Sequence, residues 1–490
     1  MKYSLFIGGE WVTGPDQEYF PAVNPYNQEI WAEVPQASEN QVIQAIDAAR
    51  DAFETAWSKT SGLERGRLMN RMADLLEADA QRMAVLETTD NGKVIRETKT
   101  QMHMAARAYR FYAGAADKLS GGLFPLDKPN VLDYAKKLPL GVAVLVTAWN
   151  SPMALLSNKL APALAAGCTV VIKPSEHASV TTLEFAKFVE QAGFPKGVVN
   201  VVTGDHRVGQ WLVNSRRVDK VSFTGSPGVG RKIASDAGRN LTPVTLELGG
   251  KSPNIIFESA DIDKAVVGAL AGIFGATGQT CIAGSRLLVQ EPVYDIIVER
   301  LVARAKGIVL GNPLDPGTEM GTLANQPQFD RVMGVIRQGA GDGAVLAAGG
   351  KRAGGVGLEK GLFIEPTIFR DVENTMTLAR EEIFGPVLSI IPFKDEASAI
   401  QMANDTDYGL AAGIWTTDLN QALRVSDAVH AGCVWVNTYR ASAMQAPFGG
   451  FKDSGFGRER SLWALDEYMT YKNVMIDFSG EERDPFAIRG

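Results

Sequence analysis

The sequence predicts a mixed α/β fold in which largely parallel sheets are covered by helices on both faces. Two observations support this prediction. From residue 142 onward, short runs rich in Val and Ile alternate with helical patterns, and apolar runs without polar alternation are typical of strands buried on both faces. The chain has 490 residues, which is too many for a single hydrophobic core. We therefore expect more than one domain.

Two helices are predicted near the start of the chain. Residues 38–53, "SENQVIQAIDAARDAF", place apolar residues at helical spacing, and Ser38 with Gln41 forms a capping-box pattern at their start. Residues 65–87 repeat apolar residues at intervals of three and four, which predicts one helix that "DNGK" at 90–93 ends. The methionines of this helix are expected to belong to the core.

Five apolar runs are the candidate strands of a first sheet, and the segments between them are its helices. A second series of strands and helices extends from residue 253 to residue 437. Residues 121–140 carry alternating strand-like residues without a helical pattern, so they are expected to leave the body of the first domain. The Gly-rich residues 339–361 predict a loop with one short strand. The five runs are "VAVLVTAW", "TVVIKP", "VVNVVTG", "KVSFTG" and "VTLEL".

Composition and charge argue against several classes of function. The formal charge is −7 and no Lys/Arg block occurs, which argues against nucleic acid as a partner. No apolar run reaches the ~20 residues of a membrane helix, and the first ten residues lack a secretory pattern. The four histidines are isolated from one another, so no metal site is expected. Three scattered cysteines, Cys168, Cys281 and Cys433, favour reduced thiols and a cytoplasmic location.

Two stretches after candidate strands have the chemistry of a nucleotide site. In "FTGSPGVG", Gly225 and Gly230 bracket a strand-to-helix turn whose backbone N–H groups suit a phosphate. An ordinary tight turn is the alternative. In "IKPSE", Lys173 can donate to ribose hydroxyls, whereas Glu176 can accept from them and would repel a 2′-phosphate. A solvated loop is the alternative here.

Other stretches have the residue types of covalent catalysis. Glu247, in "LELGGKSPN", ends an apolar strand, where a raised pKa would suit a general base. A carboxylate paired with a basic residue is the alternative. Cys281, in "GQTCIAGSR", has small neighbours, which favour a nucleophile over a buried residue that only fills space. Cys168 and Cys433 are interpreted as buried residues of that second kind. Asn150, in "AWNSP", could donate to an oxyanion or simply form a turn before proline.

Seven segments in this order and spacing make the chain similar to the NAD(P)-dependent aldehyde dehydrogenase superfamily. They are "AWNSP", "IKPSE", "FTGSPGVG", "LELGGKSPN", "GQTCIAGSR", "EEIFGPV" and "PFGGFKDSGFGRE". The resemblance runs from "FIGGEW" near the start to "YMTYKNVMI" near the end. It implies a Rossmann-like cofactor domain (1–120 and 140–249), an α/β catalytic domain (250–453) and a small β oligomerisation element (121–139 and 468–490). A homodimer or homotetramer is therefore expected.

The resemblance also implies a role for each matched residue. Cys281 would be the nucleophile and Glu247 the base, while Asn150 and the backbone N–H of Cys281 would form the oxyanion hole. Glu176 favours NAD over NADP. Lys173 is placed among both the catalytic and the cofactor-binding residues. The full expected cofactor set is Trp149, Lys173, Ser175, Glu176, Gly225, Ser226, Gly230, Glu382 and Phe384.

The chemistry that these residues permit is oxidation of an aldehyde to a carboxylic acid without a metal. Cys281 attacks the carbonyl, the thiohemiacetal loses a hydride to the nicotinamide, and water activated by Glu247 hydrolyses the thioester. The presence of Glu247 favours hydrolysis over acyl transfer to coenzyme A, which is the alternative among enzymes. A catalytically silent structural or binding homologue is the alternative from another class.

The resemblance implies that members acting on small aliphatic aldehydes have a substrate tunnel lined with aromatic residues. The tunnel expected here differs from theirs. Here only Phe448 keeps a ring, so the tunnel should be wider and more polar. Arg440 could pair with an anionic group, which would suit a carboxylated semialdehyde; a surface arginine is the alternative. The expected lining is Ser151, Asn158, Gly275, Ser442 and Phe448, with Thr280 and Ile282 beside the nucleophile.

Overall fold

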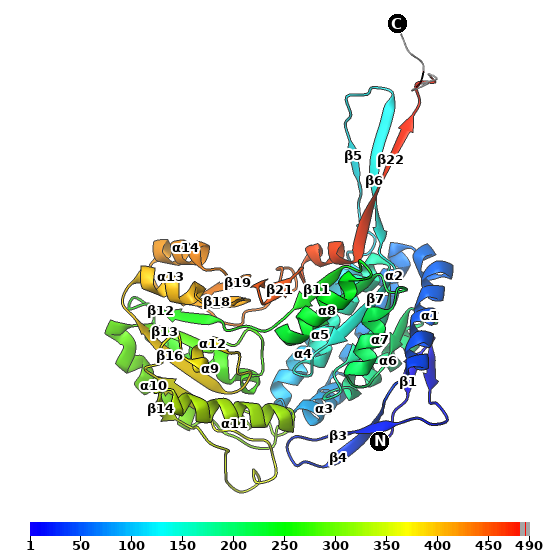
Figure 1. Cartoon of the computed structure of the whole chain (residues 1–490). Coiled ribbons are helices and arrows are strands. Elements are labelled where there is room, and N and C mark those ends of the chain that lie inside the picture. Colours follow the sequence, from blue (N-terminus) through cyan, green and yellow to red (C-terminus); the bar gives the residue numbers. More distant parts are fainter. Residues whose placement is uncertain (481–485, 487–490) are drawn as a thin grey trace.

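The computed structural model of the chain describes residues 1–480 and residue 486. Residues 481–485 and 487–490, which are part of the expected oligomerisation element, lie outside the described residues. Within the described part, no helix is both long and apolar enough to cross a membrane. Figure 1 shows a body with two helix-covered sheets and a narrow three-stranded sheet that projects from it.

The first sheet has eight strands in the order β2-β1-β9-β8-β7-β10-β11-β21. The five strands predicted from the apolar runs are its parallel centre, and all residues of β7 and β8 are buried, which confirms that both faces are covered. Antiparallel strands close both edges. The strands are β1 (Leu5–Ile7), β2 (Glu10–Val12), β7 (Val142–Thr147), β8 (Thr169–Pro174), β9 (Val199–Val201), β10 (Lys220–Thr224), β11 (Val244–Glu247) and β21 (Gly455–Phe456).

The second sheet has seven strands in the order β14-β15-β16-β13-β12-β18-β19, parallel except at β14. Two short pairs, β3 with β4 and β17 with β20, lie outside both large sheets. The second-sheet strands are β12 (Pro253–Ile256), β13 (Arg286–Gln290), β14 (Val345–Ala348), β15 (Thr367–Arg370), β16 (Val387–Phe393), β18 (Ala411–Trp415) and β19 (Cys433–Val436). The short pairs are β3 (Tyr19–Val23), β4 (Ile30–Pro35), β17 (Tyr408–Gly409) and β20 (Phe451–Lys452).

The capping box predicted at Ser38 and Gln41 is present at the start of α1. The prediction of one helix over 65–87 is wrong, because the chain leaves the helical conformation at Asp79 (φ −107°, ψ 14°) and forms two helices. The Asp79 carboxylate pairs with Arg82 of α3 at 2.6 Å; it makes no capping hydrogen bond to the start of that helix. The helices of this half are α1 (Glu39–Thr55), α2 (Gly62–Ala78), α3 (Ala80–Asn91), α4 (Ile95–Ala113), α5 (Pro152–Ala166), α6 (Val180–Ala192), α7 (His206–Asn214) and α8 (Pro227–Gly238).

The helices that accompany the second sheet begin with α9, within the predicted second series of strands and helices. Short 3₁₀ segments precede or follow several helices. The remaining elements are α9 (Ile262–Phe274), α10 (Tyr294–Lys306), α11 (Gln326–Gly341), α12 (Thr377–Arg380), α13 (Glu396–Asn404) and α14 (Leu419–Ala428), with 3₁₀ turns at Trp57–Lys59, Gly275–Gly278, Glu291–Val293 and Leu462–Tyr468.

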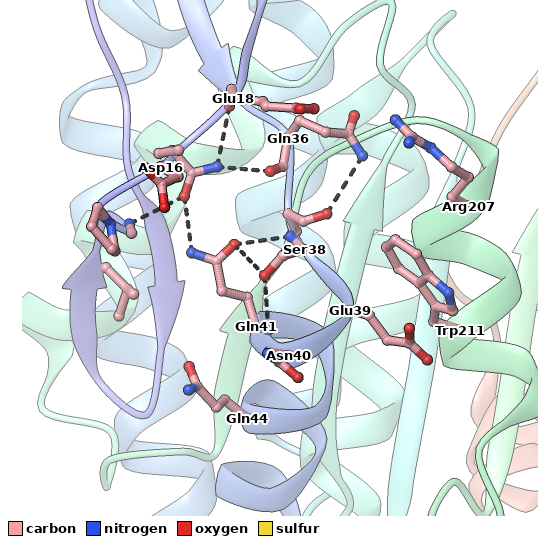
Figure 2. Close-up of a pocket in the computed structure, with 15 residues that line it drawn as sticks. Asp16, Glu18, Gln36, Ser38, Glu39, Asn40, Gln41, Gln44, Arg207 and Trp211 are labelled. Atoms are coloured by element: carbon pink, nitrogen blue, oxygen red, sulfur yellow. Dashed lines mark hydrogen bonds between the residues drawn. The ribbon is translucent and has the colours of Figure 1, made fainter.

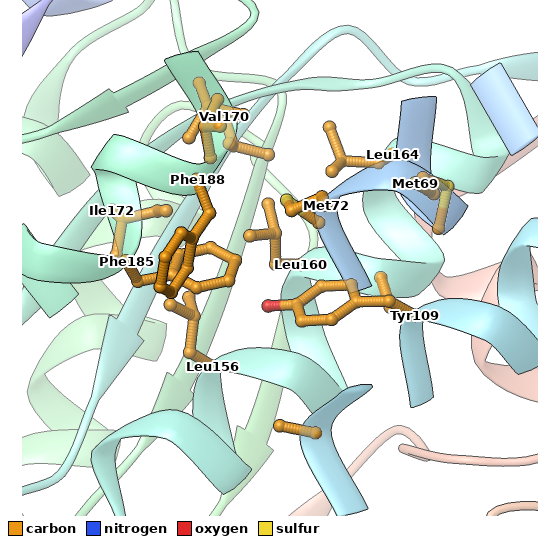
Figure 3. Packing of buried hydrophobic residues seen from close by; sticks show 14 of the residues in the cluster. Met69, Met72, Tyr109, Leu156, Leu160, Leu164, Val170, Ile172, Phe185 and Phe188 are labelled. Carbon is orange, nitrogen blue, oxygen red and sulfur yellow. The ribbon is translucent and has the colours of Figure 1, made fainter. Parts of the chain in front are cut away.

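The largest part of the core lies between β8 and helices α2, α4, α5 and α6 (Figure 3). Met72 of α2 and Met83 of α3 are fully buried, so the methionines are core residues as predicted. Tyr109 of α4 stacks on Phe185 of α6, with ring centroids 5.5 Å apart. This packing fixes the helices beneath the carboxyl ends of β7 and β8.

The projecting sheet consists of β5 (Gly122–Phe124), β6 (Val131–Pro139) and β22 (Met469–Asp477). β6 and β22 pair antiparallel over nine residues although they are more than 300 residues apart in the chain. The excursion predicted over 121–140 is therefore real, and its partner is the strand expected near the end of the chain (Figure 1).

Candidate active site

The candidate catalytic residues lie where parallel strands end. Asn150 follows β7, Lys173 is the second-last residue of β8, and Glu247 is the last residue of β11. Because parallel strands end at the same edge of a sheet, these side chains share the edge at which ligands bind in such folds. The backbone N–H of Gly225, after β10, donates to the Glu247 oxygen at 3.1 Å and ties two of these strand ends together.

Cys281 lies in a tightly held loop between α9 and β13. Cys281 is partly exposed, whereas Cys168 is fully buried as expected. Cys433 is also partly exposed, so the expectation that it is a buried filler is wrong. A Cβ on Gly278 (φ +70°) would lie 2.0 Å from the Gly385 oxygen, so this position requires glycine. On the other side, the Tyr439 hydroxyl donates to the Ile282 oxygen at 3.0 Å. The loop is thus fixed before and after the thiol.

The Asn150 side chain reaches the same loop. Its Nδ2 donates to the Gln279 oxygen at 2.9 Å, two residues before Cys281. The Gln279 side chain is itself fixed, because it donates to the Thr322 oxygen at 3.2 Å and accepts from the Ala324 N–H at 2.9 Å. An amide nitrogen carries two hydrogens, so Asn150 retains one donor for a second acceptor.

The Glu247 carboxyl group is buried without hydrogen bonds that would offset its loss of solvation. Neither carboxylate oxygen has a hydrogen-bond partner among the described residues. Burial raises the pKa of Glu247 well above its usual range, and the nearby Glu459 adds to the rise while Lys159 opposes it. Lys159 and Glu459 form a buried ion pair of 2.5 Å. A protonatable carboxyl in an apolar setting can act as a base near neutral pH.

Two glycines bring three segments together at the site. A Cβ on Gly250 would lie 2.5 Å from the Cys281 backbone oxygen, and a Cβ on Gly249 would lie 2.1 Å from Glu382 Oε2. The Gly250 N–H donates to Glu382 Oε1 at 3.1 Å. Burial raises the pKa of Glu382 to about 7, and the Gly250 N–H opposes that rise. The end of β11, the nucleophile loop and the turn before β16 therefore meet.

Burial raises the pKa of the Cys281 thiol to about 12, and Glu382 and Glu247 add to the rise. The positive charge of Arg460 opposes it. Burial and the two carboxyls therefore favour the protonated form of the thiol. The proton has to leave during attack on a carbonyl, and Glu247 is the nearby group whose raised pKa suits it to accept one.

The expected cofactor residues are distributed over two places. Trp149 and Phe384 pack edge to face, with ring centroids 5.2 Å apart, beside the Glu382 turn. Lys173 is buried at the end of β8, where its Nζ donates to the Pro174 oxygen at 3.1 Å and lies 3.7 Å from Glu176 Oε2. Burial lowers the pKa of Lys173, and Glu176 opposes that shift.

The turn between β10 and α8 fits a phosphate group. Ser226 is the N-cap of the twelve-residue helix α8, and its hydroxyl makes no capping hydrogen bond. A Cβ on Gly228 would meet nothing within 4 Å, so the space above this helix end is open. Gly230 has a different role, because a Cβ there would lie 2.6 Å from Leu248. The donors at this helix end, together with Lys173 and Glu176, match the groups of a dinucleotide.

The expected substrate residues surround the nucleophile unevenly. Ser151, the N-cap of α5, bonds to Lys93, and Asn158 is buried within α5. Arg440 lies against Gly275, and its Nη1 donates to the Ala271 oxygen at 3.3 Å. Thr280 and Ile282 are half-buried beside Cys281, and Ser442 and Phe448 lie on the loop after β19. A hollow of about 420 Å³ is lined by Arg96, Glu97, Thr100, Gln101, Met104 and Arg440.

Three residues of the site were not found from the sequence: Lys93, Tyr439 and Arg460. Lys93 belongs to "DNGK", which we interpreted only as a helix end. Tyr439 and Arg460 flank or follow matched segments, but an isolated tyrosine or arginine carries no periodic or spacing signal. Their positions depend on contacts between segments far apart in the chain.

A larger hollow of about 660 Å³ lies elsewhere, between the N-terminal segment, the start of α1 and α7 (Figure 2). Gln41 Nε2 donates to Gln17 Oε1 at 2.9 Å, and Gln17 Nε2 donates to the Gln36 oxygen at 2.7 Å. These amides serve one another and the α1 cap, so they do not indicate a ligand. Within the described residues, no group of three His, Cys, Asp or Glu side chains is placed to hold a metal ion.

Comparisons with known proteins decide the family. A family model described as the aldehyde dehydrogenase family matches residues 11–474. The chain belongs to the aldehyde dehydrogenase family. An aldehyde dehydrogenase of Emericella nidulans is 46% identical over 472 residues, which cover 96% of this chain and 94% of the relative. A (Z)-2-((N-methylformamido)methylene)-5-hydroxybutyrolactone dehydrogenase of Acinetobacter baylyi is 44% identical over the whole of both chains.

Solved structures of the family have the same fold. The betaine aldehyde dehydrogenase of Staphylococcus aureus, solved in complex with NAD⁺, has a TM-score of 0.97 and 38% identity, covering 99% of this chain and 97% of that chain. These comparisons confirm the predicted α/β fold, the activity of an NAD-dependent aldehyde dehydrogenase and NAD as the cofactor.

Proposed function

We propose that Cys281 is the nucleophile of this aldehyde dehydrogenase, with Asn150 as oxyanion donor and Glu247 as base. One observation carries the assignment: the Asn150 amide is bonded to the loop of a partly exposed thiol, beside a buried carboxylate whose oxygens have no partner. Attack on an aldehyde places the oxyanion near the Asn150 amide and the Cys281 N–H, and one such donor contributes about 3 kcal/mol.

Glu247 has two tasks in this proposal. It accepts the thiol proton during attack, and it later takes a proton from the water that hydrolyses the thioester, which releases the carboxylic acid. NAD, when bound, supplies the hydride acceptor. Lys173 and Glu176 would hold its ribose, Ser226 its phosphates, and the Trp149–Phe384 pair with Glu382 the nicotinamide end. In this proposal Lys173 binds the cofactor, since its contacts at the end of β8 are Pro174 and Glu176.

The substrate is proposed to be a polar aldehyde, and specifically one that carries a carboxylate. The Acinetobacter baylyi relative is named for a 5-hydroxybutyrolactone, and such a lactone is the ring-closed form of an aldehyde that bears a carboxyl group. Arg440 supports the proposal, because it borders the 420 Å³ hollow near Gly275 and forms no ion pair among the described residues. A guanidinium is suited to a carboxylate.

Self-association through the projecting sheet is proposed as well. β22 is an edge strand of nine residues, and an unpaired edge of that length invites pairing with a second chain. Leu123, Phe124, Met475 and Phe478 are large apolar residues exposed on or beside this sheet. A homodimer or homotetramer would cover them. For location, three free cysteines favour a reducing compartment such as the cytoplasm.

The test combines purified protein, NAD and a panel of aliphatic, hydroxylated and carboxylated aldehydes, followed by the absorbance of reduced cofactor. Cys281→Ser is expected to abolish the signal while cofactor binding remains. Formation of an acyl thioester when coenzyme A is added would favour the acylating alternative. A protein that binds NAD but oxidises no aldehyde of the panel would favour the silent alternative.

A further inference from the structure

Arg460 contacts two residues that are expected to line the substrate tunnel. Its guanidinium carbon is 4.7 Å from the centroid of the Phe448 ring, and its Nη1 donates to the Ser442 hydroxyl at 2.7 Å. Both partners are residues of the tunnel loop that follows β19. Arg460 is partly exposed, so its charge is not fully enclosed in the core.

The guanidinium has donors that the protein does not use. Among the residues that the structure describes, Arg460 forms no ion pair, and its Nε is buried without a hydrogen-bond partner. Arginine carries five N–H donors in a planar fork that matches a carboxylate. Ser442 accepts one of them, and the face of Phe448 takes up the charge only weakly. A guanidinium group with unused donors and no ion pair can bind an anionic ligand.

The charge of Arg460 acts on both reacting groups. Burial raises the pKa of the Cys281 thiol to about 12, and Arg460 opposes this rise. Burial also raises the pKa of Glu247, and Arg460 opposes that rise too. The guanidinium therefore lies within electrostatic range of the place where the aldehyde carbon must sit.

The backbone holds Arg460 in a costly conformation. Arg460 (φ 59°) and Ser461 (φ 48°) are both left-handed, although neither is glycine. The Ser461 N–H donates to the Met444 oxygen at 2.7 Å, and the Tyr112 hydroxyl donates to the Ser461 oxygen at 2.8 Å. Strained residues that the surroundings hold in place are concentrated at functional sites.

Arg440 is less suited to be the main anchor. The Glu97 carboxylate lines the same hollow as Arg440, and one Glu97 oxygen is buried without a partner. A negative charge beside a guanidinium weakens its attraction for an anion. The side-chain contacts of Arg460 are Phe448 and Ser442, and neither is charged. Of the carboxyls around it, Glu247 has a pKa that burial raises, and Glu459 already pairs with Lys159.

We propose that Arg460 is the specificity residue of this enzyme and binds the carboxylate of an anionic aldehyde whose carbonyl carbon is at Cys281. Ser442 and Phe448 orient the guanidinium, and its free N–H groups form a charge-assisted pair with the carboxylate. The inference deepens the proposed function and rests on it, since it requires an aldehyde substrate that reacts at Cys281.

The test compares two aldehydes of the same chain length, 4-oxobutanoate and its methyl ester, in kcat/KM measurements. Arg460→Met keeps an apolar stem on Phe448 and removes the charge. It is expected to lower kcat/KM for 4-oxobutanoate about 10- to 100-fold and to change the value for the ester less than threefold. Arg460→Lys, which keeps a charge without the fork, should lie between wild type and Arg460→Met. Equal losses on both aldehydes, or no loss on either, would overturn the proposal.

Arg352→Met is the matched control. Arg352 also lies over a phenylalanine, 5.5 Å from the Phe329 ring, and its Nη2 bonds only to backbone oxygens. Its replacement should leave the ratio of the two kcat/KM values unchanged. A changed ratio would show that the loss of an arginine away from the site also alters the preference between the two aldehydes, and this would overturn the proposal.

A second measurement does not depend on aldehyde oxidation. Succinate matches 4-oxobutanoate in length and carries its carboxylate, so it should slow alkylation of Cys281 by iodoacetamide in the wild type and not in Arg460→Met, whereas butyramide should protect neither. If succinate does not slow the alkylation of Cys281 in the wild type, this result would contradict the role of Arg460. Protection by succinate in a protein that oxidises no aldehyde with NAD would contradict the proposed function and leave the anion site standing.

Discussion

The Lys93 ammonium group donates to the Asn150 backbone oxygen at 2.5 Å and to the Ser151 hydroxyl at 2.6 Å. Lys93 is buried, and the turn that carries it also supplies Asn91, whose Nδ2 donates to the Trp149 oxygen at 3.3 Å. Hydrogen bonds from Asn91 and Lys93, at the junction of α3 and α4, thus hold the segment after β7 in place. The Asn150 amide depends on this support for its position over the nucleophile loop.

Replacing Lys93 with Met should lower kcat about 10- to 100-fold, because a small displacement of a catalytic donor is costly. The loss of hydrogen bonds from a charged group should also cost about 2 kcal/mol of stability. Steady-state kinetics and thermal unfolding measure the two effects. In a double-mutant cycle with Asn150→Ala, the effects on kcat should not add, since Lys93 acts through Asn150.

Lys220→Met is the control for the loss of a buried amine. Lys220 pairs with Glu467 at 3.2 Å and has no contact with Asn150. It should lower stability while kcat stays within about twofold. Additive effects of Lys93→Met and Asn150→Ala on kcat would show that Lys93 does not act through Asn150, and an unchanged kcat in Lys93→Met would show that Lys93 contributes only to stability.

Much of the fold follows from the sequence because it depends on local patterns. The parallel strands around Val142–Thr147 and Thr169–Pro174 are continuous apolar runs, and such runs have one stable environment, the inside of a covered sheet. The single helix predicted over 65–87 failed at Asp79, because the apolar periodicity continues through the break. A periodic pattern does not reveal a break that leaves the apolar spacing intact on both sides.

The site divides in the same way. Cys281, Glu247 and Asn150 were predicted from their segments, and the structure places the Asn150 amide against the loop that carries Cys281. Lys93 and Arg460 were not found, because each acts through a contact between distant segments, 57 residues apart for Lys93 and Asn150. Contacts of this range are set by packing of the whole chain, which no local pattern records.

Gly278→Ala should inactivate the enzyme. The new Cβ would lie 2.0 Å from the Gly385 oxygen, and alanine disfavours the φ of +70° at this position. The nucleophile loop must then move away from the Glu382 turn. We expect kcat/KM to fall at least 100-fold. Gly238→Ala is the matched control, since a Cβ there meets nothing within 4 Å; it should leave activity intact and keep or slightly raise the melting temperature.

The hydrolytic step should speed up as the pH rises through the elevated pKa of Glu247. Burial is the main cause of that elevation, and only the ionised carboxylate can take a proton from water. Glu247→Gln should slow thioester hydrolysis about 100- to 10,000-fold and remove this pH dependence. A burst of reduced cofactor followed by slow turnover in rapid-mixing experiments would place the larger loss in hydrolysis, and a burst as fast as that of the wild type would show that Glu247 is not needed to accept the thiol proton. An unchanged steady-state rate would remove Glu247 from the mechanism.

The same carboxyl should make stability depend on pH. In the unfolded chain it titrates near 4.5, and in the folded protein burial raises its pKa well above that value. Between the two values the folded state holds a proton that the unfolded state has lost, so stability falls as the pH rises through this window. Glu247→Gln should therefore gain melting temperature relative to the wild type as the pH increases. Parallel melting curves at all pH values would contradict this reasoning.

Charged residues on the projecting sheet should break the proposed assembly. Phe124 and Met475 are exposed on β5 and β22, and replacing both with Asp would put unpaired charges into the contact between two chains, where burying them is costly. We expect the double variant to elute as a smaller species in size-exclusion chromatography with light scattering, at unchanged far-ultraviolet circular dichroism. Leu241→Asp, at a large apolar residue exposed on the loop before β11, is the control and should keep the mass of the wild type. A wild type that is already monomeric at micromolar concentration would remove the proposed role of this sheet.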